Sequence, residues 1–186
     1  TAQWTVTGAG VVMLAGGESA KRARAVLTHT TCGRVIDLGI SDANNMGAAM
    51  CPAALHTLMT HFRDTDRGFD DYDLVVTGDL GRLGRDLLIE LLKEKKIKVC
   101  EEKLFDCGCH IFDARQDTHA GGSGCGCAAS MLCAHLLPEV AAGRLNRILF
   151  MATGALLSPT TTMQGESIPG IAHAVVIEHE GGKKTC

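Results

Sequence analysis

Residues 117–130 read Asp-Thr-His-Ala-Gly-Gly-Ser-Gly-Cys-Gly-Cys-Ala-Ala-Ser, and this stretch decides how the chain folds. Four glycines are interspersed there with small polar and thiol side chains, and apolar residues at helical spacing follow at Met131, Leu132 and Leu136. A loop with so few side chains lets its backbone approach a ligand or a neighbouring backbone closely. Because the loop opens a helix, its free N–H groups suit an anion such as a carboxylate.

Short apolar segments lie on both sides of this loop and alternate with helical patterns. Residues 74–77 and 148–151 are almost entirely apolar, which is typical of strands in a sheet covered on both faces. We expect strands at 4–14, 25–29, 35–36, 74–77, 97–99, 111–112, 148–151 and 171–177. We expect helices from about 46 or 48 to 62, from 81 to the basic run at 93–96, and from the glycine loop to about 137. This order predicts an α/β fold, a mixed sheet with helices on its faces.

Composition sets the broad class. The 186 residues are 46% hydrophobic and 21% charged, which suits one globular domain. A net charge of -3 gives no nucleic-acid footprint, and no apolar run is long enough for a transmembrane segment. The nine cysteines are odd in number and poorly spaced for pairing, which indicates a reducing compartment without a disulfide framework.

The motifs resemble the stage V sporulation protein AD family of the thiolase-like superfamily, whose fold thiolases and ketoacyl synthases share. The resemblance covers nearly the whole chain. The segments that carry it are residues 42–50, 76–81, 116–127, 150–157 and 164–176. Family members are about twice this long, so the resemblance implies that residues 1–186 are a single thiolase-like C-terminal half-domain, without the N-terminal half that would carry a nucleophile-like cysteine. The start at Thr1, without Met, agrees with a processed chain or the downstream part of a longer protein.

The resemblance also implies a role. Proteins of this family belong to the sporulation system that moves dipicolinic acid into the developing spore and releases it in germination. The family is expected to bind dipicolinic acid without catalysing condensation. The implied partners are dipicolinic acid, other stage V sporulation A proteins at the spore inner membrane and the missing N-terminal half, with no cofactor and no nucleic acid. The implied location is intracellular, peripheral to the forespore or spore inner membrane.

A condensing enzyme of this fold places a His after one strand of this half, and a second His or Asn in a loop. Here the first place reads Thr77-Gly78-Asp79, and an ionised Asp79 cannot donate a hydrogen bond to an oxyanion. The second place offers Ser123 and Cys125, with His119 upstream. We therefore expect no catalytic residue, although a thiolase-fold acyltransferase remains the first alternative.

The candidate ligand-binding residues gather around the glycine loop. His119 either donates to a ligand carboxylate or serves as a structural loop residue. Asn44 and Asn45 are most simply helix caps, with a ligand role as the alternative. The ligand-binding candidates are Thr77, Asp79, His119, Gly122, Ser123, Gly124 and Cys125.

Two further patterns invite other functions. The runs Cys107-Gly108-Cys109-His110 and Cys125-Gly126-Cys127 suggest a metal or redox module, the second alternative. A one-residue spacing between cysteines is unusual for zinc, and we expect no metal. The basic runs at 21–24 and 93–98 could meet anionic lipid, but short runs of this kind are more often solvated.

Overall fold

A mixed sheet of five strands forms the centre of the protein in the computed structural model, which describes residues 2–181. The strand order is β2-β7-β6-β3-β4. Strands β6, β3 and β4 run parallel, and β7 lies antiparallel to both β6 and β2. The five strands are β2 (Ala25–Thr31), β3 (Leu74–Thr77), β4 (Leu104–Asp106), β6 (Arg147–Ala155) and β7 (Gly170–His179).

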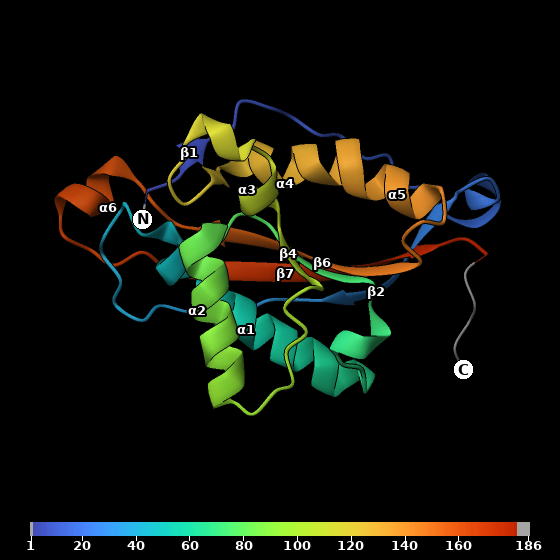
Figure 1. Cartoon of the computed structure of the whole chain (residues 1–186), viewed down its shortest axis with the longest axis horizontal. Helices are drawn as coiled ribbons and strands as arrows, with labels where there is room; N and C mark the ends of the chain where they lie inside the picture. The colour runs from blue at the N-terminus through green and yellow to red at the C-terminus, as the bar shows by residue number, and fades with distance from the viewer. Residues whose placement is uncertain (1, 182–186) are drawn as a thin grey trace.

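Helices cover both faces of this sheet (Figure 1). On one face lie α1 (Met46–Thr65) and α2 (Gly81–Glu94). On the other face lie α3 (Cys107–His110) and a continuous helical rod of α4 (Cys125–Met131), the π-helical turn η4 (Leu132–Leu136) and α5 (Leu137–Ala141). The remaining elements are short: β1 (Trp4–Thr5), η1 (Gly17–Ala20), η2 (Phe69–Asp71), η3 (Ala114–Gln116), β5 (Gly122–Ser123) and α6 (Pro159–Met163).

The core divides into two layers because successive strand residues point to opposite faces of the sheet. Val75 packs with α1 and α2, and its neighbour Val76 packs with α3 and α4. On β6, Leu149 and Met151 pack in the same layer as Val75, and Ile148 and Phe150 pack in the same layer as Val76. The prediction of an α/β fold with a mixed sheet and helices on both faces is confirmed.

The prediction of a strand over residues 4–14 is wrong beyond its first residues. Only Trp4–Thr5 forms a strand, and it pairs in parallel with Gly122–Ser123 outside the main sheet. The segment after it follows the α4 rod. A Cβ added to Gly10 would lie 2.4 Å from the carbonyl oxygen of Ala129. The apolar residues of this segment have strand character, but beyond Val6 no strand of the described chain pairs with it.

Two other expectations need correction. Residues 97–99 and 111–112 form no strand, and the edge strand is Leu104–Asp106 between them. Ile97 and Val99 instead pack against the core from an irregular connection. The helix after the glycine loop continues past Pro138 to Ala141, because the π-helical turn before Pro138 accommodates a residue without an N–H. The sequence predicts a frayed tail over residues 181–184, and all of it beyond Gly181 lies outside the described residues.

Candidate ligand site

The glycine loop packs closely against its own chain. A Cβ on Gly121 would lie 2.3 Å from the carbonyl oxygen of Gly108, and one on Gly126 would lie 2.5 Å from that of Gly8. A Cβ on Gly122 would meet the Ile111 side chain at 2.6 Å. A loop with so few side chains can approach either a ligand or other protein atoms. These three glycines approach other parts of the same chain.

Gly124 differs from the other loop glycines. Its φ of +95° lies in the region that favours glycine, and an added Cβ would meet only Thr5 Cγ2, at 3.5 Å. Gly124 is the N-cap of α4, as the sequence predicts for a loop that opens a helix. This backbone turns the amide of Gly124 toward the end of β3.

Asp79 receives that amide. The Gly124 N–H donates to Asp79 Oδ2 at 2.9 Å, and the Thr153 hydroxyl donates to Asp79 Oδ1 at 2.9 Å. The Asp79 N–H donates in turn to Thr153 Oγ1 at 3.0 Å. One carboxylate thus joins the ends of two adjacent parallel strands to the glycine loop.

The environment of Asp79 is unfavourable to its charge. The side chain is only 8% exposed, and burial raises its pKa to about 6. The donors Gly124 and Thr153 lower this pKa, and the neighbouring charge of Asp106 raises it further. Asp79 therefore changes charge close to neutral pH.

Asp106, the last residue of β4, binds the turn that follows β3 through hydrogen bonds. This fully buried carboxylate accepts the Thr77 hydroxyl at 2.7 Å and the amides of Leu80, Gly81 and Cys109 at 2.9 to 3.0 Å. Asp106 also caps the N-terminus of α3. Four donors compensate the burial of one charge, so the loop after β3 is held rigidly beneath Asp79.

A cavity of about 530 Å³ opens above Asp79. Thr5, Asn44 and Ser123 contribute polar side chains to its wall, and no hydrogen bond joins these three side chains to the rest of the described chain. Among the described lining residues there is no Lys, Arg or His. The cavity is lined by Ala2, Gln3, Thr5, Ala43, Asn44, Met46, Met50, Asp79, Ser123, Gly124, Cys125, Ala128, Ala152, Thr153, Gly154, Ala155 and Leu157.

The cavity brings together four of the residues chosen from the sequence, namely Asp79, Ser123, Gly124 and Cys125. The other three do not line it. Thr77 is buried against Asp106, and Gly122 packs against the side chains of Ile111 and Val6. His119 is exposed with a φ of +52°, and its carbonyl accepts a hydrogen bond from the Arg82 guanidinium.

Thr153 and Asn44 are cavity residues that sequence reasoning did not select. Thr153 follows the buried part of β6, just as Asp79 follows β3. Because the carboxyl ends of parallel strands meet at one edge of a sheet, these polar residues could have been paired from the sequence. The sequence favours a cap role for Asn44 over a ligand role, but the α1 cap is Asn45, whose side chain accepts the Ala48 N–H.

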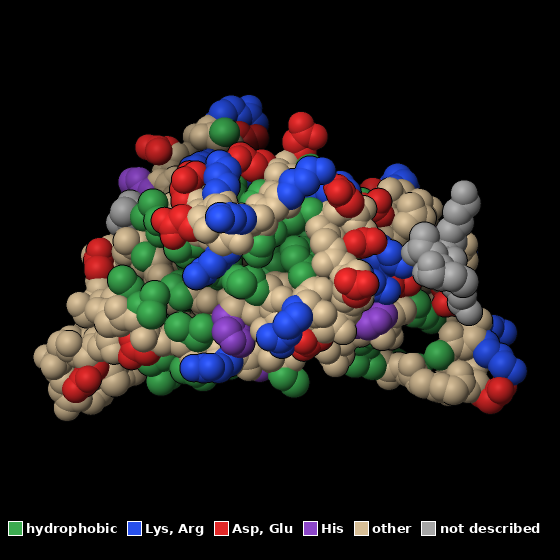
Figure 2. All heavy atoms as spheres, turned by 90° about the horizontal axis from the view of Figure 1, so that it is seen from below, with side chains coloured by type: hydrophobic (Ala, Val, Ile, Leu, Met, Phe, Trp, Pro, Cys, Tyr) green, Lys and Arg blue, Asp and Glu red, His purple; other side chains and the backbone are tan. Residues whose placement is uncertain are grey.

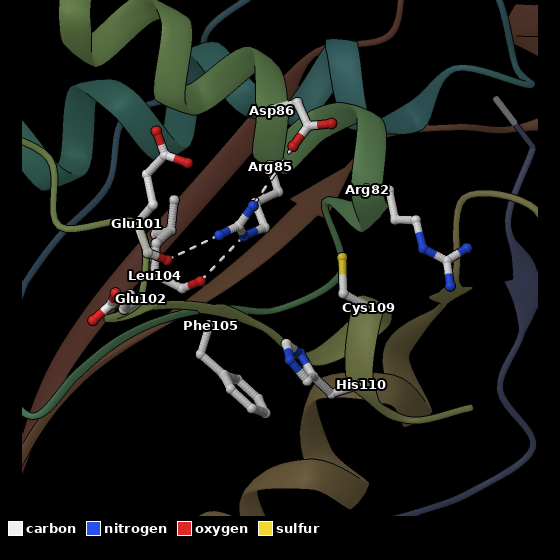
Figure 3. A pocket seen from close by; sticks show the side chains of 9 residues that line it. All are labelled: Arg82, Arg85, Asp86, Glu101, Glu102, Leu104, Phe105, Cys109 and His110. Carbon is white, nitrogen blue, oxygen red and sulfur yellow. Dashed lines mark hydrogen bonds and ion pairs between the residues drawn. The ribbon is translucent and has the colours of Figure 1, made fainter. Parts of the chain in front are cut away.

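A second cavity, of about 500 Å³, lies between α2, α3 and the segment before β4 (Figure 3). Its most buried cation, Arg85, already donates to the carbonyl oxygens of Leu104 and Glu101 at 3.1 and 2.9 Å, as the dashed lines in Figure 3 mark. Asp86, Glu101 and Glu102 contribute acidic side chains to the same wall. These guanidinium contacts fix the connection to β4, so this cavity is a weaker candidate.

Of the four paired cysteines, Cys107 and Cys127 are buried, Cys109 is half-buried and Cys125 is exposed. Burial raises the pKa of both Cys109 and Cys127 to about 12, and it also raises that of Cys107. Between residues 2 and 181, no group of three or more Cys, His, Asp or Glu side chains has an arrangement that could hold a metal ion. Because their pKa values are raised, Cys107, Cys109 and Cys127 form little thiolate, which is the nucleophilic form of cysteine.

The basic run at the end of α2 lies among acids. Lys93 Nζ is 3.2 Å from Glu90 and 3.1 Å from Glu101, and Lys98 Nζ is 3.6 Å from Asp70. Acidic and basic side chains are intermixed over the α1 and α2 side of the protein (Figure 2). Across residues 2–181, no helix combines the length and apolar character needed to cross a membrane.

Comparison with known proteins places the chain in a family. Residues 1–178 match the family described as stage V sporulation protein AD. The chain is 46% identical over 182 residues to stage V sporulation protein AD of Bacillus subtilis (strain 168). This alignment covers 98% of the chain and 52% of the relative, so the chain spans about half the length of the curated relative it matches. With its sheet, its glycine loop and this match over nearly its whole length, the chain belongs to the stage V sporulation protein AD family.

Proposed function

We propose that the protein carrying this chain binds dipicolinic acid in the cavity above Asp79, without catalysing condensation, and takes part in its movement into the spore and its release in germination. The observation that carries this proposal is the wall of the cavity. Thr5, Asn44 and Ser123 offer neutral donors without partners in the described chain. Met46 and Leu157 belong to an apolar surface beside them, which suits a flat ring.

The shape of the ligand fits this combination. Dipicolinate has a planar pyridine ring with a carboxylate on each side of the ring nitrogen. Hydroxyl and amide donors can bind the carboxylate oxygens, and each such bond to a charged acceptor contributes about 1.5–3 kcal/mol. A volume of about 530 Å³ accommodates one molecule of this size.

The chain acts, in this proposal, as the C-terminal half of a thiolase-like protein. The relative of about twice its length supports this view, since it has room for a second half of similar size. That second half would contribute the rest of the binding site. The proposed location is peripheral to the forespore or spore inner membrane, with the other stage V sporulation A proteins as partners.

Ligand binding is favoured over acyl transfer by the groups that line the cavity. Condensation needs a donor that stabilises an oxyanion and a group that moves protons at the reacting thiol. Asp79 lies in the loop that follows β3, and both of its carboxylate oxygens accept hydrogen bonds. The described lining residues provide no imidazole for either task.

Two neighbouring asparagines test the proposal. Asn44 lines the cavity, whereas Asn45 caps α1 through its bond to the Ala48 N–H at 3.3 Å. In the intact natural protein, Asn44→Ala should weaken dipicolinate binding about tenfold or more with unchanged thermal stability. Asn45→Ala should lower the free energy of unfolding by about 1 kcal/mol and leave the affinity nearly unchanged.

Isothermal titration calorimetry and thermal melts measure the two effects. Absence of dipicolinate binding to the intact protein would contradict the proposed function outright. Equal loss of affinity in both variants would remove the cavity from the site. Turnover of an acyl thioester that depends on Asp79 would favour the acyltransferase instead.

A further inference from the structure

Asp79 is the only side chain with a full charge among the described residues that line the cavity. It lies at the base of the wall formed by Gly124 and Thr153, and 8% of its surface is exposed. Both carboxylate oxygens already accept a hydrogen bond from the protein. A dicarboxylate that enters the cavity therefore meets a negative charge, with no lining cation described to offset it.

The groups around Asp79 increase this conflict. Asp106 approaches it from β4, and the thiols of Cys107 and Cys127 interact with it from α3 and α4. Gln3 donates to the backbone oxygen of Asp79 at 3.0 Å, not to its carboxylate. Of these groups, Asp106 is acidic and disfavours a further negative charge beside it, and the two thiols are neutral and supply no positive charge to offset it.

From this arrangement we infer that Asp79 takes up one proton when a dicarboxylate binds, so that the site captures its ligand together with a proton. This inference rests on the proposed function of the cavity. The proton comes from the solvent and adds to one carboxylate oxygen of Asp79. The new hydroxyl donates to a ligand carboxylate, while the other oxygen continues to accept from the Gly124 N–H. Protonation thus replaces the repulsion between the Asp79 carboxylate and the ligand carboxylate by a hydrogen bond, in which Asp79 donates and the charged ligand carboxylate accepts.

The direction of the pH dependence follows. Burial raises the pKa of Asp79 to about 6 before any ligand arrives, and a bound anion raises it further. Above pH 6 the free protein is ionised at Asp79 and the complex is protonated, so binding consumes a proton. Affinity should fall by up to about tenfold for each pH unit above 6, and should level off below it.

Calorimetry on the intact natural protein measures this uptake directly. Dipicolinate is titrated at pH 7.5 in two buffers of different ionisation enthalpy, and the difference in heat gives the protons bound per ligand. We expect a value approaching one. In Asp79→Asn the amide mimics the protonated acid, since its oxygen can accept from Gly124 and its nitrogen can donate to the ligand. This variant should show no uptake and little pH dependence.

Asp86→Asn provides the matched control. It removes one carboxylate from an exposed position on α2 that does not line the cavity above Asp79. Its proton uptake should equal that of the unaltered protein. Infrared difference spectra of the unaltered protein give a second measurement, in which a protonated-carboxyl band should appear on addition of dipicolinate.

The outcomes separate the two proposals. Binding without proton uptake and without the infrared band overturns this inference and leaves the proposed function standing. Uptake that persists in Asp79→Asn likewise assigns the proton elsewhere and overturns it. Absence of dipicolinate binding at every pH between 5.5 and 8 overturns both. If Asp79→Asn does not fold, the infrared band and the buffer difference in the unaltered protein still decide.

Discussion

The backbone N–H of Gly124 donates to the carboxylate of Asp79 across 2.9 Å. The sequence suggests the opposite use of that amide, since the first N–H groups of a helix are suited to an external anion. Here the protein supplies its own anion. A ligand in the cavity must therefore rely on other donors in the wall, and the position of Asp79 depends on the backbone of Gly124.

Replacing Gly124 should affect both stability and binding. Its φ of +95° strains any other residue, so Gly124→Ala should lower the free energy of unfolding by about 1–3 kcal/mol. The displaced amide should also weaken its bond to Asp79 and reduce dipicolinate affinity, and Gly124→Val should do so more strongly. Chemical denaturation and calorimetry measure the two effects.

Gly39→Ala is the control for this prediction. Gly39 has a φ of +77°, and a Cβ there would meet nothing within 4 Å. The control shares the backbone strain but lies outside the cavity lining. It should lose stability and keep its affinity for dipicolinate. A correctly folded Gly124→Val protein with unaltered affinity would exclude the glycine loop from the site.

Removing Asp106 should be more damaging than removing any exposed carboxylate. Asp106→Ala leaves the Thr77 hydroxyl and three backbone amides without an acceptor in a buried place. We expect the free energy of unfolding to fall by about 3–5 kcal/mol. Asp113→Ala is the comparison, since exposed Asp113 caps the short helix η3 and pairs with Arg115 at the surface, and this variant should lose far less stability. Comparable losses in urea denaturation would show that the network is not structurally important.

Stability should depend on pH through two buried groups with opposite signs. Burial raises the Asp79 pKa from 3.8 to about 6, so the folded state binds this proton more tightly and stability falls as the pH rises from 4 to 6. Burial lowers the His61 pKa from 6.5 to about 4, so stability rises over nearly the same range. Each difference corresponds to about 3 kcal/mol, and the two should largely cancel.

Single variants should separate these contributions. Asp79→Asn should leave the His61 effect alone, so that stability increases from pH 4 to 6.5 and exceeds that of the unaltered protein at pH 7. His61→Gln should show the reverse slope, although it also loses hydrogen bonds to Thr31 and Tyr72 at 2.7 and 2.6 Å. Urea midpoints across this pH range provide the measurement. Parallel curves for the two variants would contradict the assignment of these protons.

Local patterns were sufficient for much of the fold. Apolar strands such as Leu74–Thr77 and the helical spacing in Gly81–Glu94 predict those elements because each is defined by its own residues. The edge strand Leu104–Asp106 has only three residues and ends in a buried charge, so its sequence gives little strand signal. This segment forms a strand because it pairs with β3, a distant part of the chain, and the residues of the segment alone do not indicate that pairing.

The candidate site was only partly predictable for the same reason. The glycine loop identified Ser123, Gly124 and Cys125 because small residues before a helix have a clear physical meaning. Asp106, which is essential to the turn beneath the cavity, lies 26 residues from Leu80 and acts through tertiary hydrogen bonds. His119 stood out as a titratable residue beside the loop, but its ring does not line the cavity. Spacing along the chain does not reveal which side of a loop faces a cavity.

The final prediction concerns association of the isolated chain. The helix after Gly124 carries Ala128, Ala129, Met131, Leu132 and Leu136, so its sequence predicts an apolar surface that would be partly exposed in an isolated half-domain. Residues 6–10 cover part of that surface, and Leu136 is buried. The exposed apolar strip is formed instead by the next residues, with Val11 91%, Met13 93% and Leu14 71% exposed. Burial of apolar surface contributes roughly 25 cal/mol per Å², so residues 1–186 alone should dimerise, aggregate or unfold early.

Analytical ultracentrifugation and thermal melts test this expectation. Val11→Ser with Met13→Ser should reduce association, whereas Met163→Ser, which alters an 86% exposed side chain on α6, should not. A polypeptide equivalent to the half of the Bacillus subtilis relative that the chain does not match should also suppress association, because we propose that it packs on this strip. A monodisperse monomer with a cooperative melt in the ordinary mesophilic range would show instead that the strip needs no partner.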